Sequence, residues 1–200
     1  MNKIIKDAAA LLGITLVAGI LLGLVYSVTL EPIAQQEAQA KEEACREVFS
    51  DAESFEAAEV DAAAIDANLK ENGLDKVTID EVLVAKDAAG EAMGYVLTVT
   101  DSEGYGGDIQ FSMGVRMDGT LNAISILSIS VTAGLGMKAD TDEFKSQFAG
   151  KNVERFEYTK SGASADNEID ALSGATFTTS AMINGVNGGL CTFQYLKYAL

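Results

Sequence analysis

The chain has 200 residues and a mass of 21.0 kDa, which is room for one domain and one short membrane element. Its 14 basic and 30 acidic residues give a formal net charge of −16, and so acidic a surface repels nucleic acid and anionic lipid headgroups. Because histidine is absent, His-ligated haem, His-containing zinc sites and Ser-His-Asp catalysis are excluded.

Two cysteines, Cys45 and Cys191, are too few for a four-cysteine iron–sulfur or zinc site, so the sequence predicts no metal centre. They lie far apart in the sequence, and two interpretations stay open. The cysteines form one disulfide if the domain faces an oxidising space, or they are buried or idle thiols.

Residues 8–30 contain no charged side chain. As a helix this stretch would span roughly 34 Å, enough to cross the hydrocarbon core of a bilayer. A cleaved signal peptide is the competing interpretation, but no convincing cleavage site follows the apolar stretch, and we favour a retained anchor. Lys3 and Lys6 precede the stretch, so the positive-inside rule places residues 1–7 in the cytoplasm and residues 31–200 outside.

The segment after the anchor, residues 31–75, is expected to be an acidic connecting region. Residues 32–49 are rich in Ala, Glu, Gln and Lys and predict a helix with a thin apolar face. The more acidic residues 50–75 predict short helices or loop. No linker rich in proline or serine marks a domain boundary there.

The remainder, residues 76–200, predicts one α+β domain in which helices pack on an antiparallel sheet. Strands are expected at 82–85, 94–100, 109–117 and 121–129, with a hairpin turn at Asp118-Gly119. The strict alternation in 109–117 is typical of a half-buried strand. A helix at about 142–150 would bury Phe144 and Phe148, one turn apart.

The C-terminal stretch has a helical apolar period formed by Ile183, Val186, Leu190, Phe193 and Leu196. Three glycines interrupt it, each unfavourable in a free helix by about 1 kcal/mol against alanine. They indicate either close packing of the helix backbone or an irregular helix; the glycines are Gly185, Gly188 and Gly189.

A loop rich in hydroxyl side chains, residues 170–180, precedes this helix. Such residues cap helices, and the same N–H groups with the helix dipole favour an anion. On these grounds alone an ordinary cap is the simpler interpretation. The alternative is a phosphate cradle built without a basic side chain from Ser173, Thr176, Thr178, Thr179 and Ser180.

The sequence Ser173-Gly174-Ala175-Thr176, with Asp170 three residues ahead of the serine, resembles the flavinylation motif of the FMN-binding domain family. This resemblance implies that Thr176 carries FMN through a phosphoester bond installed by a flavin transferase. Residues 104–109, 132–136 and 148–151 follow in the order of the family. Together with the anchor, nearly the whole chain is similar to G subunits of Rnf complexes.

The chain departs from the family pattern at the glycine-rich turn. The family reads Glu-Thr-Pro-Gly-Leu-Gly there, whereas this chain reads Val131-Thr132-Ala133-Gly134-Leu135-Gly136. No role for a Glu side chain carries over. The turn keeps its glycines, so we expect it to approach the flavin with its backbone.

The resemblance implies a redox subunit of an ion-translocating ferredoxin:NAD⁺ oxidoreductase, with no catalytic residue of its own. Its expected partners are integral membrane and iron–sulfur or flavin subunits of the complex, the flavin transferase and membrane lipid. Two alternatives remain: a flavinylated subunit of another extracytoplasmic electron route, such as a Na⁺-pumping NADH:quinone reductase, and a non-redox membrane-anchored scaffold. The flavin contacts predicted besides Thr176 are Asp170, Ser173, Gly174, Ala175, Thr178, Thr179, Tyr105, Gly106, Gly107, Thr132, Gly134, Leu135 and Gly136.

Overall fold

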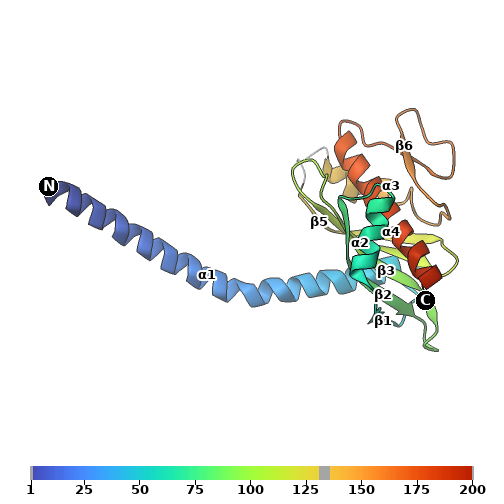
Figure 1. Ribbon diagram of the computed structural model, residues 1–200, viewed down its shortest axis with the longest axis horizontal. Helices are drawn as coiled ribbons and strands as arrows, with labels where there is room; N and C mark the ends of the chain where they lie inside the picture. The colour runs from blue at the N-terminus through green and yellow to red at the C-terminus, as the bar shows by residue number, and fades with distance from the viewer. Residues whose placement is uncertain (1, 131–135, 200) are drawn as a thin grey trace. The chain divides into compact units, whose positions relative to one another are not determined.

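The computed structural model describes residues 2–130 and 136–199, without the side chains of the two end residues. The chain divides into two compact units, residues 1–40 and residues 41–200. The first unit is most of helix α1 (Asn2–Val48), and the second holds every other helix and strand that the structure describes (Figure 1).

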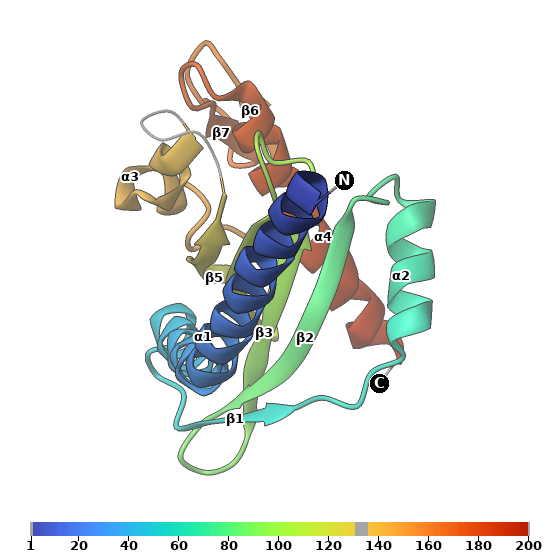
Figure 2. The ribbon, with the colours of Figure 1, turned by 90° about the vertical axis from the view of Figure 1, so that its left-hand side faces the viewer.

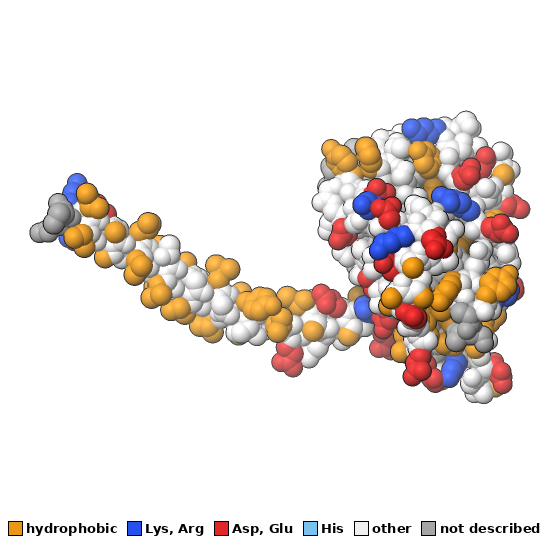
Figure 3. All heavy atoms as spheres, in the orientation of Figure 1, with side chains coloured by type: hydrophobic (Ala, Val, Ile, Leu, Met, Phe, Trp, Pro, Cys, Tyr) orange, Lys and Arg blue, Asp and Glu red, His pale blue; other side chains and the backbone are white. Residues whose placement is uncertain are grey.

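Helix α1 confirms the predicted apolar N-terminal helix. Among the described residues it is the one helix long and apolar enough to cross a bilayer. The side chains of residues 8–30 are all exposed, and apolar groups cover the face of this stretch that Figure 3 shows. A helix that is apolar and exposed along this length is stable only where something other than water surrounds it.

The sheet of the second unit is a five-stranded antiparallel meander in the order β1-β2-β3-β4-β5. Each strand pairs with the next in the sequence, and the turn at Asp118-Gly119 joins β4 to β5 as predicted. Two short parallel strands, β6 (Glu157–Thr159) and β7 (Glu168–Asp170), form a separate pair. The strands of the meander are β1 (Ser54–Ala57), β2 (Val77–Lys86), β3 (Ala92–Asp101), β4 (Ile109–Arg116) and β5 (Leu121–Ile129).

Helices α2 (Ala62–Glu71) and α4 (Thr176–Ala199) pack together, and α4 crosses β2, β3 and β4 on one face of the sheet (Figure 2). Asp61 starts α2 by accepting hydrogen bonds from the backbone N–H groups of Ala63 and Ala64, at 3.0 and 3.1 Å. Between α4 and the sheet lies the main core, in which Leu97, Phe111 and Met113 are fully buried.

The three glycines of α4 confirm the prediction of close packing. A Cβ on Gly185 would lie 2.8 Å from the Phe111 ring, one on Gly188 2.6 Å from Val77, and one on Gly189 2.1 Å from the Met113 sulfur. Because real Cβ atoms do not approach so closely, the glycines set the spacing between helix and sheet.

The opposite face of the sheet carries a second, smaller core at the C-terminal end of α1. Val48 and Phe49 are fully buried there against Val96. Gly94 and Gly114 make room for the Phe49 ring, and a Cβ on Gly114 would lie 2.9 Å from it. The end of α1 is therefore part of the domain fold.

This second core corrects one prediction and answers one open question. The alternation in 109–117 predicted a half-buried strand, but β4 is buried on both faces because α4 covers one and Phe49 the other. Cys45 belongs to the second core, whereas Cys191 packs on the main core from α4. Both cysteines are free thiols, and Cys191 Sγ lies 2.9 Å from Asn68 Oδ1.

Two further segments differ from their predicted elements. The predicted helix at 142–150 is shorter, since α3 covers only Asp142–Lys145 and follows the 3₁₀ helix η1 (Gly136–Asp140). Phe144 and Phe148 are nevertheless buried and meet edge to face at 5.5 Å. Residues 50–75 contain β1 and α2, so this stretch includes a strand that the acidic sequence did not predict. The predicted boundaries at 30/31 and 75/76 stay predictions.

Candidate functional site

The loop between β7 and α4 is held by its own hydrogen bonds. The Ala175 N–H donates to the Leu172 carbonyl at 3.1 Å. The Thr179 hydroxyl accepts from the Leu172 N–H and donates to the Ala175 carbonyl, both at 3.0 Å. Gly174 has a φ of +77°, a left-handed conformation that residues with a Cβ rarely adopt. Together these contacts fix Thr176 as the first residue of α4.

Thr176 lies at the wall of a cavity of about 410 Å³, a volume within the range of small-molecule sites. Thr176 is itself only half-buried. None of the described residues that line this cavity carries a charge, although the chain has 30 acidic residues. The lining residues are Tyr105, Gly136, Gly174, Ala175, Thr176, Phe177 and Thr178.

The start of α4 favours an anion at this wall. The helix has 24 residues and no acidic side chain in its first turn. Its first N–H groups have no acceptor within the helix, and the dipole places about half a positive charge there. A phosphate on the Thr176 oxygen would lie at this positive end, so the local electrostatics fit the predicted phosphoester.

The structure brings six of the predicted contact residues together around one cavity: Tyr105, Gly136, Gly174, Ala175, Thr176 and Thr178. Asp170 and Ser173 line a neighbouring cavity of about 310 Å³, on which Lys138 also borders. Ser173 and Gly174 are consecutive in the loop but line different cavities.

Other predicted residues have structural contacts of their own. Thr179 is fully buried, and its hydroxyl is already engaged by the loop. Gly107 packs against Ser130, and a Cβ there would lie 2.8 Å from the Ser130 Cβ. Gly106 does not line the cavity among the described residues, but it turns the same loop with a φ of +109°. The predicted contacts Thr132, Gly134 and Leu135 lie outside the residues that the structure describes.

Phe177 is a lining residue that the sequence reasoning missed. It follows Thr176 directly and is 68% exposed. Its ring stacks on that of Tyr105 with centroids 6.1 Å apart and an angle of 29° between the planes. The signal available in the sequence was an aromatic residue in a stretch that otherwise holds small and hydroxyl side chains.

Asp101 ends β3 and begins the loop that presents Tyr105. Its side chain is fully buried, and Oδ1 accepts a hydrogen bond from the Glu103 N–H at 2.7 Å. Oδ2 has no hydrogen-bond partner among the described residues. Burial raises the pKa of this carboxyl to about 6. The hydrogen bond from the Glu103 N–H opposes the rise, and the negative charges of Glu103 and Asp108 add to it. The loop beside the cavity therefore starts at a carboxyl that titrates near neutral pH.

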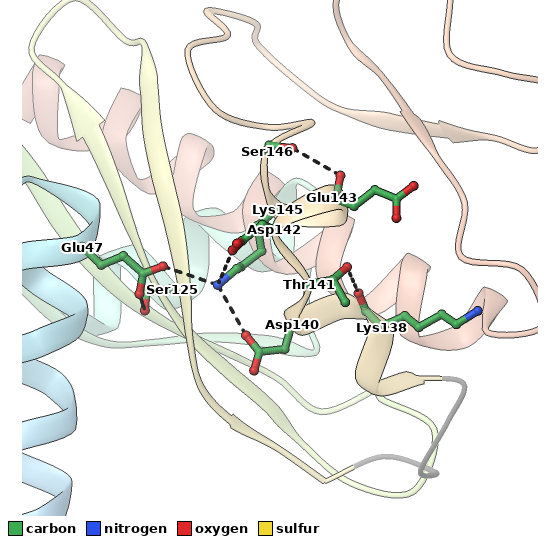
Figure 4. A network of polar contacts seen from close by, with 9 residues as sticks. All are labelled: Glu47, Ser125, Lys138, Asp140, Thr141, Asp142, Glu143, Lys145 and Ser146. Carbon is green, nitrogen blue, oxygen red and sulfur yellow. Dashed lines mark hydrogen bonds and ion pairs between the residues drawn. The ribbon is translucent and has the colours of Figure 1, made fainter.

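A largely buried lysine, Lys145, connects the end of α1 to the cavity wall. Lys145 Nζ lies 3.4 Å from Glu47 Oε1 and 3.5 Å from Asp140 Oδ1 (Figure 4). Ser125 donates a hydrogen bond to the other Glu47 oxygen at 2.5 Å. Burial by itself lowers the pKa of Lys145, but the two carboxylates outweigh it and hold the pKa above its ordinary value. This network anchors η1, whose first residue is Gly136 of the cavity.

Comparison with known proteins places the chain in a family. A family model described as FMN-binding domain matches residues 104–190, and one described as RnfG N-terminal region matches residues 1–48. The chain is 32% identical over 197 residues to the G subunit of the Na⁺-translocating ferredoxin:NAD⁺ oxidoreductase complex of Acetobacterium woodii, over 97% of this chain and 93% of the relative. The chain belongs to the RnfG family.

A second relative agrees with that assignment, and a solved structure agrees with the fold. The G subunit of the proton-translocating ferredoxin:NAD⁺ oxidoreductase complex of Clostridium ljungdahlii is 29% identical over 170 residues, 85% of this RnfG-family chain and 80% of the relative. The crystal structure of Shewanella oneidensis NqrC matches with a TM-score of 0.50 and 20% identity, over 60% of this chain and 61% of that one. This structural likeness confirms the α+β fold.

Proposed function

We propose that this RnfG-family chain is the electron-transfer subunit of an ion-translocating ferredoxin:NAD⁺ oxidoreductase complex, and that it carries FMN as a phosphoester on Thr176. The observation that carries the proposal is the position of Thr176, which is half-buried at the start of α4 and lines a cavity whose described lining residues carry no charge. Bound FMN would supply the capacity to accept and release electrons.

The residues of the chain would attach, orient and shield this group. The N-terminal end of α4 stabilises the phosphate charge. Gly136 and Gly174 bring backbone to the cavity wall, and Tyr105 and Phe177 supply aromatic surface there. The covalent bond keeps the cofactor on the protein whatever the strength of these contacts, which suits a site facing the external medium.

The proposed topology places residues 1–7 in the cytoplasm, α1 across the membrane and the domain outside. Lys3 and Lys6 support this orientation through the positive-inside rule. The membrane stretch contains no charged residue, so ion translocation would belong to other subunits of the complex. Those subunits, a flavin transferase and lipid are the proposed partners. Protease added to intact spheroplasts should remove the domain, and a protected domain would contradict the orientation.

The phosphoester is tested by denaturing electrophoresis of the full chain made together with a flavin transferase. We expect a band with flavin fluorescence that is lost in Thr176→Val. Ser180→Ala is the matched control and should keep the band. Although Ser180 is one of the hydroxyl residues of the possible phosphate cradle, it lies one turn further along α4 and lines a different cavity from Thr176. A sample made without the transferase should lack it. A non-fluorescent wild-type band, with an unmodified Thr176 peptide in mass spectrometry, would contradict the attachment.

Membership of the complex has a separate test. Pull-down of the tagged full chain from its native membranes should recover integral membrane subunits of the same complex. Recovery of quinone reductase subunits instead would favour the other redox role that the sequence left open.

A further inference from the structure

We propose that Tyr105 and Phe177 form the surface on which the flavin ring packs, with the Tyr105 phenol in contact with that ring. This inference rests on the proposed function, because it concerns the same cofactor at the same cavity. It assigns a contact to Phe177, which no sequence pattern singled out.

The domain exposes an unusually large aromatic surface to water beside Thr176. Tyr105 is 60% exposed and Phe177 is 68% exposed, although burying such a ring is favourable. In the described part of residues 41–198, three of the six exposed large apolar side chains are at or next to residues that line this cavity. The three are Tyr105, Met137 and Phe177.

The two aromatic residues reach the cavity from different elements. Tyr105 comes from the loop after β3, and Phe177 from the first turn of α4. Their rings stack at 6.1 Å, and both line the cavity that Thr176 lines. Two unconnected segments therefore build one aromatic wall next to the proposed attachment point.

The cavity and the flavin ring also match in their chemistry. The isoalloxazine ring of FMN is planar, aromatic and uncharged, and the described lining of this cavity carries no charge. Aromatic rings stack favourably in offset geometry. Because Thr176 and Phe177 are consecutive, a group tethered to Thr176 is held near the Phe177 ring at a high effective concentration, so even a weak stacking contact would be occupied.

The two aromatic residues would act on the flavin differently, and the difference is measurable. A phenol in contact with an excited flavin ring donates an electron to it and takes the electron back without light emission. A phenyl ring packs in the same way but does not donate. Tyr105 should therefore quench flavin fluorescence in the folded protein, whereas Phe177 should contribute packing alone.

The test uses the full flavinylated chain in detergent, with fluorescence normalised to bound flavin from its absorbance. We expect emission of the wild-type protein to rise severalfold on unfolding in denaturant. In the folded state, Tyr105→Phe should raise emission severalfold, and Phe177→Tyr should lower it further by adding a second phenol. Phe177→Leu should lower the fluorescence anisotropy, because the ring loses a packing surface.

Tyr198→Phe is the matched control. Tyr198 is 89% exposed at the far end of α4, about 33 Å from Thr176 along the helix axis, so its loss should leave emission unchanged. Unchanged emission in both Tyr105→Phe and Phe177→Tyr would overturn the inference, provided that the denatured bands remain fluorescent. Loss of the wild-type band itself would instead contradict the proposed attachment, so the two failures are distinguishable.

Discussion

Gly185→Ala tests whether the glycines of α4 set the distance between this helix and the sheet. The new Cβ would lie 2.8 Å from Phe111 Cε1 and 2.9 Å from Cζ, with Val99 Cγ1 at 3.6 Å. Carbon atoms in contact are usually at least about 3.5 Å apart. The Phe111 ring is fully buried, so it has little room to move away.

Two opposing effects decide the size of the change. Overpacking a close-packed core costs about 1–3 kcal/mol. Replacing glycine by alanine inside a helix recovers about 1 kcal/mol. Because a rigid ring takes the collision, the overpacking cost should lie in the upper part of its range. We expect the free energy of unfolding to fall by about 1–2 kcal/mol.

The assay is urea unfolding of the full chain in detergent, followed by near-ultraviolet circular dichroism. Asn184→Ala, at a half-exposed neighbouring position of α4, is the control: it should gain helix propensity without a collision. A second arm repeats Gly185→Ala in a Phe111→Leu background, where the ring is removed. The cost of the alanine should shrink or reverse there, which a double-mutant cycle measures.

If Gly185→Ala stabilised the protein as much as Asn184→Ala, the glycines would have no role in setting the distance between helix and sheet. That result would mean that the helix shifts outward at no cost and that the glycines do not determine the packing distance. An equal cost in both backgrounds would also refute that role, because the collision with Phe111 would then not be the cause.

Three further predictions concern groups around the cavity. Asp101→Asn should stabilise the protein at pH 7.5 by up to about 3 kcal/mol, and this gain should vanish near pH 4. The reason is that burial raises the pKa of Asp101 to about 6 in the folded protein. The contribution of Asp101 to stability is therefore complete in acid, where the carboxyl is protonated, and is lost as the pH rises through 6. Urea unfolding at both pH values checks this, and a gain independent of pH would contradict it. Lys145→Met should lower the free energy of unfolding by about 1–3 kcal/mol at low salt, because Glu47 and Asp140 lose a largely buried partner. Lys145→Arg keeps the charge and should retain most of the stability. An equal loss of stability in both variants would argue against the ion pairs as its cause. Gly174→Ala should lower the free energy of unfolding by about 1–2 kcal/mol, because Gly174 has a φ of +77°. It should also reduce the yield of fluorescent protein on denaturing gels. A full yield with unchanged thermal unfolding would show that the loop tolerates a Cβ.

The sequence by itself determined the parts of this protein that depend on local pattern. The apolar stretch at 8–30, the alternation of 109–117 and the turn at Asp118-Gly119 each depend on residues adjacent in the chain, and the structure confirms the elements that they predict. The glycines within the apolar helical face predicted either close packing of α4 or an irregular helix, and the structure shows the close packing.

The tertiary structure alone decided what covers each surface. Burial of β4 on both faces depends on Phe49, which is 62 positions before Phe111 in the sequence, and nothing in the alternation of the strand indicates that partner. The same holds for the pairing of Tyr105 with Phe177, for the buried Asp101 and for the contacts of Lys145. Local propensity is set by neighbours in the chain, whereas burial and pairing are set by segments that meet only after the chain has folded.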